Sequence, residues 1–189
     1  MSSVVTPAQV TIEEFLALPD DGVERDLIYG QVREYGMTKR NRRHSKIEAH
    51  IVGYLHAWVQ KNEPPRGAVH SGEVGCILSR DPSIVVGIDA AYFAAESAQE
   101  MTDETSMIIG PPVLAVEVLS PYDTIRDLDE KVTIYLKYGV ALVWIVNPDF
   151  QTVTVFRPDA APVLFNATQQ LTAEPHLPGF SVPVAALFE

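Results

Sequence analysis

The stretch Val113-Leu-Ala-Val-Glu-Val-Leu119 decides the fold class, because every residue in it except Glu117 is apolar. A run of this length that is apolar on both faces is typical of a central β-strand covered by helices on each side. Pro111-Pro112 precedes the run and Ser120-Pro121 ends it. We therefore predict an α/β (α+β) chain in which this strand lies inside a central mixed β-sheet flanked by helices.

The segments around this strand supply the helices and the rest of the sheet. Apolar residues recur at steps of three and four from about Asn41 to Gln60, which predicts a long amphipathic helix. A second helix is predicted to end at Tyr138, before Gly139. The other predicted elements are a short helix after the capping box 11–14, a hairpin over 25–35, strands at 74–78, 84–93, 140–146 and 152–156, a turn at 79–82 and a surface loop at 100–106.

Length and composition indicate an ordinary globular protein. The 189 residues fit one domain, which we expect to span 1–189. No stretch reaches the roughly 20 apolar residues that cross a bilayer, so no membrane partner is expected. The first residues show no secretory signal, and the single Cys76 excludes an internal disulfide. A cytoplasmic location is the simplest expectation.

Two acids stand in runs that are otherwise apolar. Asp89 lies within the predicted strand 84–93, as Glu117 lies within 113–119. Burying a lone carboxylate costs several kcal/mol unless it is paired, protonated or bound to a metal. The alternative is that each acid points outward at a strand end or pairs with an arginine. Two such acids on strands that are candidates to be neighbours favour a shared function.

A lysine joins these acids. The 3.6-residue helical period places Lys131 on the same apolar face as Leu128 and Tyr135. An inward lysine is costly unless its ammonium group reaches solvent or an acid. One interpretation is a salt bridge with Glu117 or Asp127 that only fixes the helix. The other is a catalytic lysine, and the same geometry would serve both.

The ligand chemistry favours a hard cation. Asp89 and Glu117 supply oxygen ligands, which suit Mg²⁺ or Mn²⁺. The carbonyl of Val118 is a candidate third ligand, and Lys131 would stabilise charge or help to orient the attacking water. Zinc is disfavoured, because the five histidines show no HExxH pattern.

The charges of the chain give two opposing indications about nucleic-acid binding. The net charge of −11, from 14 basic and 25 acidic residues, weighs against nucleic-acid binding, which depends on neutralising phosphates. Five of the basic residues nevertheless cluster at the start of the long helix: Lys39, Arg40, Arg42, Arg43 and Lys46. Cations there oppose the helix dipole, so an anionic partner would explain them. A solvated helix start is the alternative.

Several motifs together resemble a known family. Gly72-Glu-Val-Gly, Ile88-Asp89-Ala-Ala-Tyr-Phe, Glu117-Val-Leu-Ser-Pro121 and Asp127…Lys131…Tyr135 resemble the putative restriction endonuclease (Uma-type) family of the PD-(D/E)XK nuclease superfamily. The resemblance covers residues 11–187. It implies a restriction-endonuclease-like core, a Mg²⁺- or Mn²⁺-dependent endonuclease acting on DNA, and Asp89 and Glu117 as metal ligands. A homodimer is expected by analogy, because superfamily nucleases that cut both strands often dimerise.

This sequence departs from the superfamily pattern at two positions. The lysine of that pattern lies two residues after the second acid, where this chain has Leu119, and the resemblance implies that Lys131 replaces it. Ile88 stands where the family has the proline of its Pro-Asp motif; proline is not a ligand, so the chemistry is expected to be spared. The resemblance also implies that Asp26 assists a second metal and that His44 contacts phosphate or orients water.

Three functions are therefore in competition. The leading one is a Mg²⁺-dependent endonuclease that hydrolyses DNA phosphodiester bonds, with the basic segment 39–46 on the DNA backbone. The second is a binding or assembly module that keeps the fold without the activity, which the acidic balance and the displaced lysine favour. The third, a metal-dependent hydrolase of a small phosphorylated substrate, lacks a glycine-rich phosphate loop in this sequence.

Overall fold

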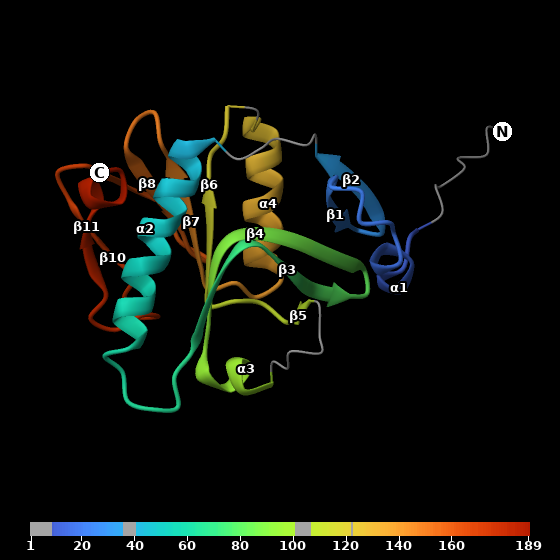
Figure 1. Cartoon of the computed structure of the whole chain (residues 1–189), viewed down its shortest axis with the longest axis horizontal. Helices are drawn as coiled ribbons and strands as arrows, with labels where there is room; N and C mark the ends of the chain where they lie inside the picture. Colours follow the sequence, from blue (N-terminus) through green and yellow to red (C-terminus); the bar gives the residue numbers. More distant parts are fainter. Residues whose placement is uncertain (1–8, 36–40, 101–106, 122) are drawn as a thin grey trace.

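The structure is a computed structural model that describes residues 9–35, 41–100, 107–121 and 123–189 (Figure 1). In chain order its elements are α1 (Ile12–Leu16), β1 (Glu24–Ile28), β2 (Gln31–Tyr35), α2 (Arg42–Val59), β3 (Ala68–Arg80), β4 (Ser83–Phe93), α3 (Ala95–Glu100), β5 (Ile108–Ile109), β6 (Leu114–Val118), α4 (Ile125–Lys137), β7 (Leu142–Asn147), β8 (Thr152–Phe156), β9 (Val163–Asn166), β10 (Gln170–Thr172), β11 (Ser181–Pro183) and the 3₁₀ helix η1 (Val184–Leu187).

Nine of the described strands form one mixed sheet. Seven of them follow the order β2-β1-β4-β6-β7-β8-β9, while β3 pairs with β4 and β5 pairs with β3. Strand β6 runs antiparallel to β4 and parallel to β7. All five of its residues are buried. The prediction of a central strand over 113–119 is therefore confirmed, and with it the fold class.

Helices α2 and α4 lie on opposite sides of the sheet (Figure 1). The buried face of α2, which includes Ile47, Ile51 and Leu55, packs with Trp144 and the C-terminal segment in one hydrophobic core. Ile134 and Tyr135 of α4 belong to a second core on the other side. None of the described helices is long and apolar enough to cross a membrane.

Polar caps fix where these two helices begin. The Asn41 side chain accepts a hydrogen bond from the backbone N–H of His44 at 2.9 Å, so the first turn of α2 is anchored. The Thr124 hydroxyl accepts one from the N–H of Asp127 at 3.2 Å at the start of α4. Gly139, with φ of +99°, follows α4 in a conformation that favours glycine. The caps set the positions along each helix at which His44 and Lys131 face the sheet.

One predicted strand has different boundaries in the structure, and one helix was not predicted. Strand β3 runs from Ala68 to Arg80, well beyond the predicted 74–78, because its ladder with β4 continues to the pair Arg80 and Ser83. Ser79 and Arg80, which the sequence predicts to lie in a turn, therefore belong to the strand. Helix α3 was not expected, and most of the predicted loop 100–106 lies outside the described residues.

The packing of α2 against the sheet should contribute strongly to the free energy of unfolding of the protein. We expect Ile51→Ala to lower the free energy of unfolding by about 2–5 kcal/mol, because Ile51 is 1% exposed and the lost methyl groups leave a cavity. Urea denaturation would measure this. Ile125→Ala is the matched control on α4, since Ile125 is 80% exposed, and should change stability by no more than about 0.5 kcal/mol. Similar losses in both variants would contradict the packing described.

Candidate active site

The register of the sheet brings Asp89 and Glu117 together. Ala90 of β4 pairs with Val116 of β6, so Asp89 and Glu117 are the next residues along the two antiparallel strands. Asp89 Oδ2 accepts a hydrogen bond from the backbone N–H of Val118 at 2.7 Å. Asp89 and Glu117 are 4% and 8% exposed. The prediction that these acids are buried on neighbouring strands is therefore confirmed.

A β-bulge lies opposite Asp89 and directs its side chain. Ser71 pairs with Ala90 and Val74 pairs with Ile88, so Gly72 and Glu73 of β3 together oppose the single residue Asp89. Both bulge residues have positive φ, +86° and +61°. On β4, Ile88 and Ala91 both face the α4 core, although residues three apart in a regular strand face opposite sides. The strand therefore twists at Asp89, which turns its carboxylate toward the end of β6 and helix α2.

Helix α4 supplies two partners to Glu117. Lys131 Nζ donates a hydrogen bond to Glu117 Oε2 at 3.0 Å, and the Tyr135 hydroxyl donates one to Glu117 Oε1 at 2.6 Å. Tyr135 is fully buried, and its hydroxyl also lies 3.4 Å from the carbonyl oxygen of Gly87. Both oxygens of Glu117 are thus held in place by donors from consecutive turns of one helix.

Burial and charge shift the pKa values of this group. Burial raises the pKa of Glu117 to about 7; the ammonium of Lys131 acts against this shift, and the charge of Asp89 adds to it. Burial works to lower the pKa of Lys131, but the Glu117 and Asp26 carboxylates outweigh it and raise that pKa. Lys131 therefore stays protonated at neutral pH, while Glu117 can take up or release a proton there.

Asp26 is a third buried acid beside Lys131. It is 4% exposed, and its Oδ1 accepts a hydrogen bond from the backbone N–H of Gly87 at 2.9 Å. Burial raises the pKa of Asp26, whereas Lys131 and a hydrogen bond from Tyr35 lower it. The Lys131 ammonium also lies 5.9 Å from the centre of the Tyr35 ring. The β1–β2 hairpin thus brings both a carboxylate and an aromatic ring to the lysine.

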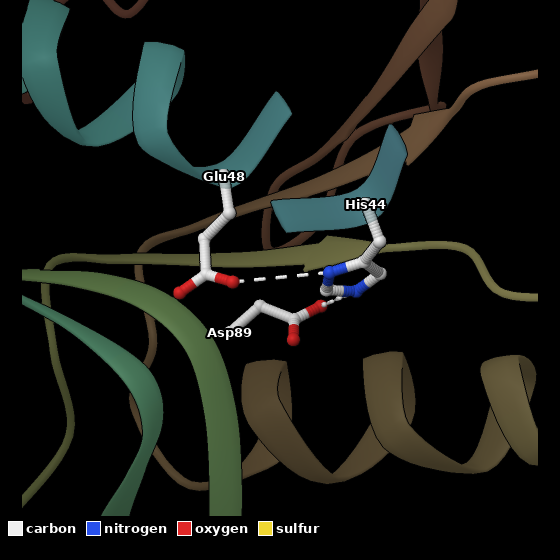
Figure 2. Close-up of side chains that lie close together, drawn as sticks. All are labelled: His44, Glu48 and Asp89. Carbon is white, nitrogen blue, oxygen red and sulfur yellow. Dashed lines mark ion pairs between the residues drawn. The ribbon is translucent and has the colours of Figure 1, made fainter. Parts of the chain in front are cut away.

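His44 faces the carboxylate of Asp89 and that of a further acid, Glu48 (Figure 2). Its Nε2 is 3.3 Å from Asp89 Oδ2, and its Nδ1 is 3.8 Å from Glu48 Oε2, one turn further along α2. His44 and Glu48 are both buried. Glu48 Oε1 accepts a hydrogen bond from the backbone N–H of Gly72 at 2.8 Å, so this cluster is joined to the bulge.

A cleft of about 1310 Å³ opens onto these groups, and Asp26, His44, Asp89, Glu117 and Lys131 all line it. Its walls carry further acids, namely Asp20, Glu24, Glu34, Glu73, Asp123 and Asp127. The cleft therefore has a strongly acidic lining around the half-buried ammonium group of Lys131, which favours cations over bare phosphate groups.

The predicted basic segment is only partly described. Lys39 and Arg40 lie outside the described residues. Arg42 and Lys46 are exposed one turn apart on α2, whose Asn41 and His44 border the cleft. Arg43 forms an ion pair with Asp149 at 2.8 Å and a hydrogen bond to the carbonyl oxygen of Pro148, so its charge is directed toward the β7–β8 turn.

Comparison with known proteins identifies the family. The family model described as Uma2, Putative restriction endonuclease, matches residues 12–185. The chain belongs to the Uma2 family. Membership in this family supports a nuclease, whose substrate is nucleic acid.

Solved structures share the fold of this Uma2 chain. One of them is the crystal structure of a putative nuclease belonging to DUF820 from Anabaena variabilis ATCC 29413, with a TM-score of 0.77 and 23% sequence identity over 95% of this chain and 97% of that one. At this identity the likeness shows the fold alone. No curated protein matches the chain with statistical significance.

Sequence patterns predict no role for two residues of this Uma2 site. Helical periodicity places Tyr135 on the inward face of its helix, but nothing in the sequence shows that its hydroxyl meets Glu117. Glu48 carried a usable signal, since it is four residues after His44 and both fall on the buried face of α2. The HExxH pattern does not include Glu48, because His44 is the only histidine in this group.

The bond between Tyr135 and Glu117 predicts a pH-dependent loss of stability in Tyr135→Phe. This hydrogen bond favours the ionised carboxylate, so its removal raises the pKa of Glu117 further above about 7. When the pKa of a carboxyl group is raised in the folded state, the stability that this group contributes to the protein is lost as the pH rises through that pKa. We expect a loss of about 1–3 kcal/mol near pH 8.5 and a smaller loss near pH 5, measured by urea denaturation.

Tyr54→Phe is the matched control for this change, because the Tyr54 side chain is 40% exposed on the surface of α2. It should change the free energy of unfolding by no more than about 0.5 kcal/mol at either pH. An equal loss at both pH values in Tyr135→Phe would mean that the hydroxyl does not act on the charge of Glu117.

Proposed function

We propose that this chain is a divalent-metal-dependent endonuclease that hydrolyses phosphodiester bonds of DNA. The observation that carries the proposal is the arrangement at the floor of the cleft. Two buried carboxylates, Asp89 and Glu117, lie on adjacent strands, and Lys131 contacts one of them at 3.0 Å. Together with membership in the Uma2 family, this arrangement favours phosphodiester hydrolysis over a purely structural salt bridge.

The residues fit a hard cation. Asp89 and Glu117 offer carboxylate oxygens, and an ionised carboxylate has about four lone-pair positions, so the hydrogen bonds already made to each leave room for a ligand bond. The carbonyl oxygen of Val118 is the proposed third ligand, since the N–H of the same residue already holds Asp89 at 2.7 Å. Oxygen donors of this kind suit Mg²⁺ or Mn²⁺, which are the cations we propose here.

Each residue then has a defined task in the reaction. When bound, the cation polarises a phosphate oxygen. Lys131, which stays charged, stabilises the negative charge that develops on the phosphate or holds the attacking water. Asp26 keeps that ammonium group in place from the other side and is a candidate to assist a second metal. Tyr135 holds Glu117 by a hydrogen bond from a fully buried hydroxyl.

DNA binding requires a cationic surface, because the acidic cleft walls repel phosphate groups. Arg42 and Lys46, exposed on α2 beside the cleft, are the proposed backbone contacts among the described residues. Lys39 and Arg40 belong to the same proposed segment. His44 at the border of the cleft is proposed to contact phosphate or orient water. A two-fold homodimer, which would allow both strands to be cut, stays a prediction.

The central test is the substitution Glu117→Gln. The amide keeps the shape of the side chain but removes the charge that holds the cation, so we expect Mg²⁺-dependent cleavage of DNA to fall by at least about 10²-fold. Plasmid cleavage assays would measure this, with circular dichroism to verify folding. Glu63→Gln, at an exposed position after α2, is the matched control and should cleave like the unchanged protein.

An inactive assembly module makes the opposite prediction for this experiment. In that case the unchanged protein would cleave neither DNA nor RNA with Mg²⁺ or Mn²⁺. Calorimetry would then detect no binding of either cation. Cleavage that survives Glu117→Gln would also contradict the proposed role of this acid.

The proposed DNA contacts predict a change in salt dependence. Replacing Arg42 and Lys46 together with glutamine should weaken DNA binding and reduce the slope of log affinity against log salt by about 2, because each lysine or arginine contact accounts for about one unit. Fluorescence anisotropy at several salt concentrations would measure the slope. Lys61→Gln, beyond the far end of α2, is the control; an unchanged slope in the double variant would exclude these contacts.

A further inference from the structure

Three buried side chains on the α2 side of Asp89 form a compact group of ligand atoms. His44, Glu48 and Asp89 each offer one nitrogen or oxygen, and these atoms all lie within 4.8 Å of one another. All three residues are at most 9% exposed. Figure 2 shows the imidazole between the two carboxylates. The group is therefore separate from the Glu117–Lys131 contact, although Asp89 is also the cross-strand neighbour of Glu117.

Each of the two carboxylates is fixed by a backbone N–H. Glu48 Oε1 accepts from Gly72 in the bulge at 2.8 Å, and Asp89 Oδ2 accepts from Val118 at 2.7 Å. The imidazole is held by its place in the first turn of α2, which Asn41 caps. The three ligand residues, two on α2 and one on β4, are thus held in position before any cation binds. Such preorganisation lowers the free-energy cost of binding.

The group brings two buried carboxylates to one imidazole. His44 directs Nδ1 toward Glu48 Oε2 at 3.8 Å and Nε2 toward Asp89 Oδ2 at 3.3 Å. Two buried carboxylates that lie this close together are unfavourable unless positive charge lies near them. A divalent cation held among the three ligand groups would supply that charge.

We propose that His44, Glu48 and Asp89 bind a second divalent cation, with Asp89 shared between this cation and the one held by Asp89 and Glu117. The shared carboxylate makes the inference rest in part on the proposed function. A single imidazole with two carboxylates is a donor set that suits a transition metal such as Mn²⁺ and suits Mg²⁺ less well. We therefore expect Mn²⁺ to fill both sites and Mg²⁺ to fill the Glu117 site in preference.

Access to this second site exists from two directions. His44 and Asp89 line the main cleft, whereas Glu48 lines a second cavity of about 550 Å³ between α2 and β3. Ser45, His56 and Ser71 lie on the walls of that second cavity. A cation can therefore approach Glu48 without passing the Glu117–Lys131 contact.

Calorimetry and electron paramagnetic resonance with Mn²⁺ alone would count the bound cations. We expect two equivalents for the unchanged protein, one for Glu48→Gln and one for Glu117→Gln. The glutamine at 48 keeps an oxygen for the Gly72 N–H, and His44→Asn is a second variant that should also bind one. Glu63→Gln, the control, should bind two.

The pattern of losses separates the two proposals. One equivalent in the unchanged protein that survives Glu48→Gln and His44→Asn but not Glu117→Gln would overturn the second site and leave the proposed function standing. Losses in Glu48→Gln and His44→Asn but not in Glu117→Gln would support the second site and contradict the proposed metal role of Glu117. No binding by the unchanged protein would overturn both.

Discussion

The ion pair between Lys131 and Glu117 is the interaction on which the site depends. Glu117 lies in the most buried strand of the sheet, where a lone carboxylate would be strongly unfavourable. The lysine, the Tyr135 hydroxyl and the partial protonation implied by a pKa of about 7 together make this burial tolerable. Lys131 and Tyr135 both lie on α4, so the position of that helix against the sheet and the charge state of Glu117 are coupled.

The bulge in β3 has a comparable role on the other side of the site. It places Gly72 and Glu73 opposite Asp89, at the point where the alternation of β4 shifts by one residue between Ile88 and Ala91. The N–H of Gly72 in this bulge donates a hydrogen bond to Glu48 of α2. The irregularity in the sheet therefore lies beside Asp89 and also anchors the neighbouring acid of α2.

The acidic character of the protein fits a site that works with cations. The cleft gathers carboxylates from its walls and floor around the half-buried ammonium group of Lys131, in a chain whose net charge is −11. Phosphate groups would be repelled from such a cleft unless bound cations offset the negative charge. The exposed basic side chains of Arg42 and Lys46 lie on α2 and do not line the cleft, so they do not compete with its carboxylates for a metal ion.

The sequence by itself determined the central strand, the two flanking helices and the inward position of Lys131, because hydrophobic periodicity reports directly on which face of an element is buried. It also identified Asp89 and Glu117, since an acid in an apolar run is visible without coordinates. The contacts of Tyr135 and Glu48, the bulge opposite Asp89 and the extension of β3 to Arg80 were decided only by the tertiary structure. Two of the site's contacts join residues far apart in the sequence: Tyr135 and Glu117 are 18 residues apart, and Val118 and Asp89 are 29 residues apart. His44 and Glu48 lie on adjacent turns of α2, but helical spacing alone does not show which polar groups a side chain contacts. Such contacts depend on strand register and on the packing of helices against the sheet.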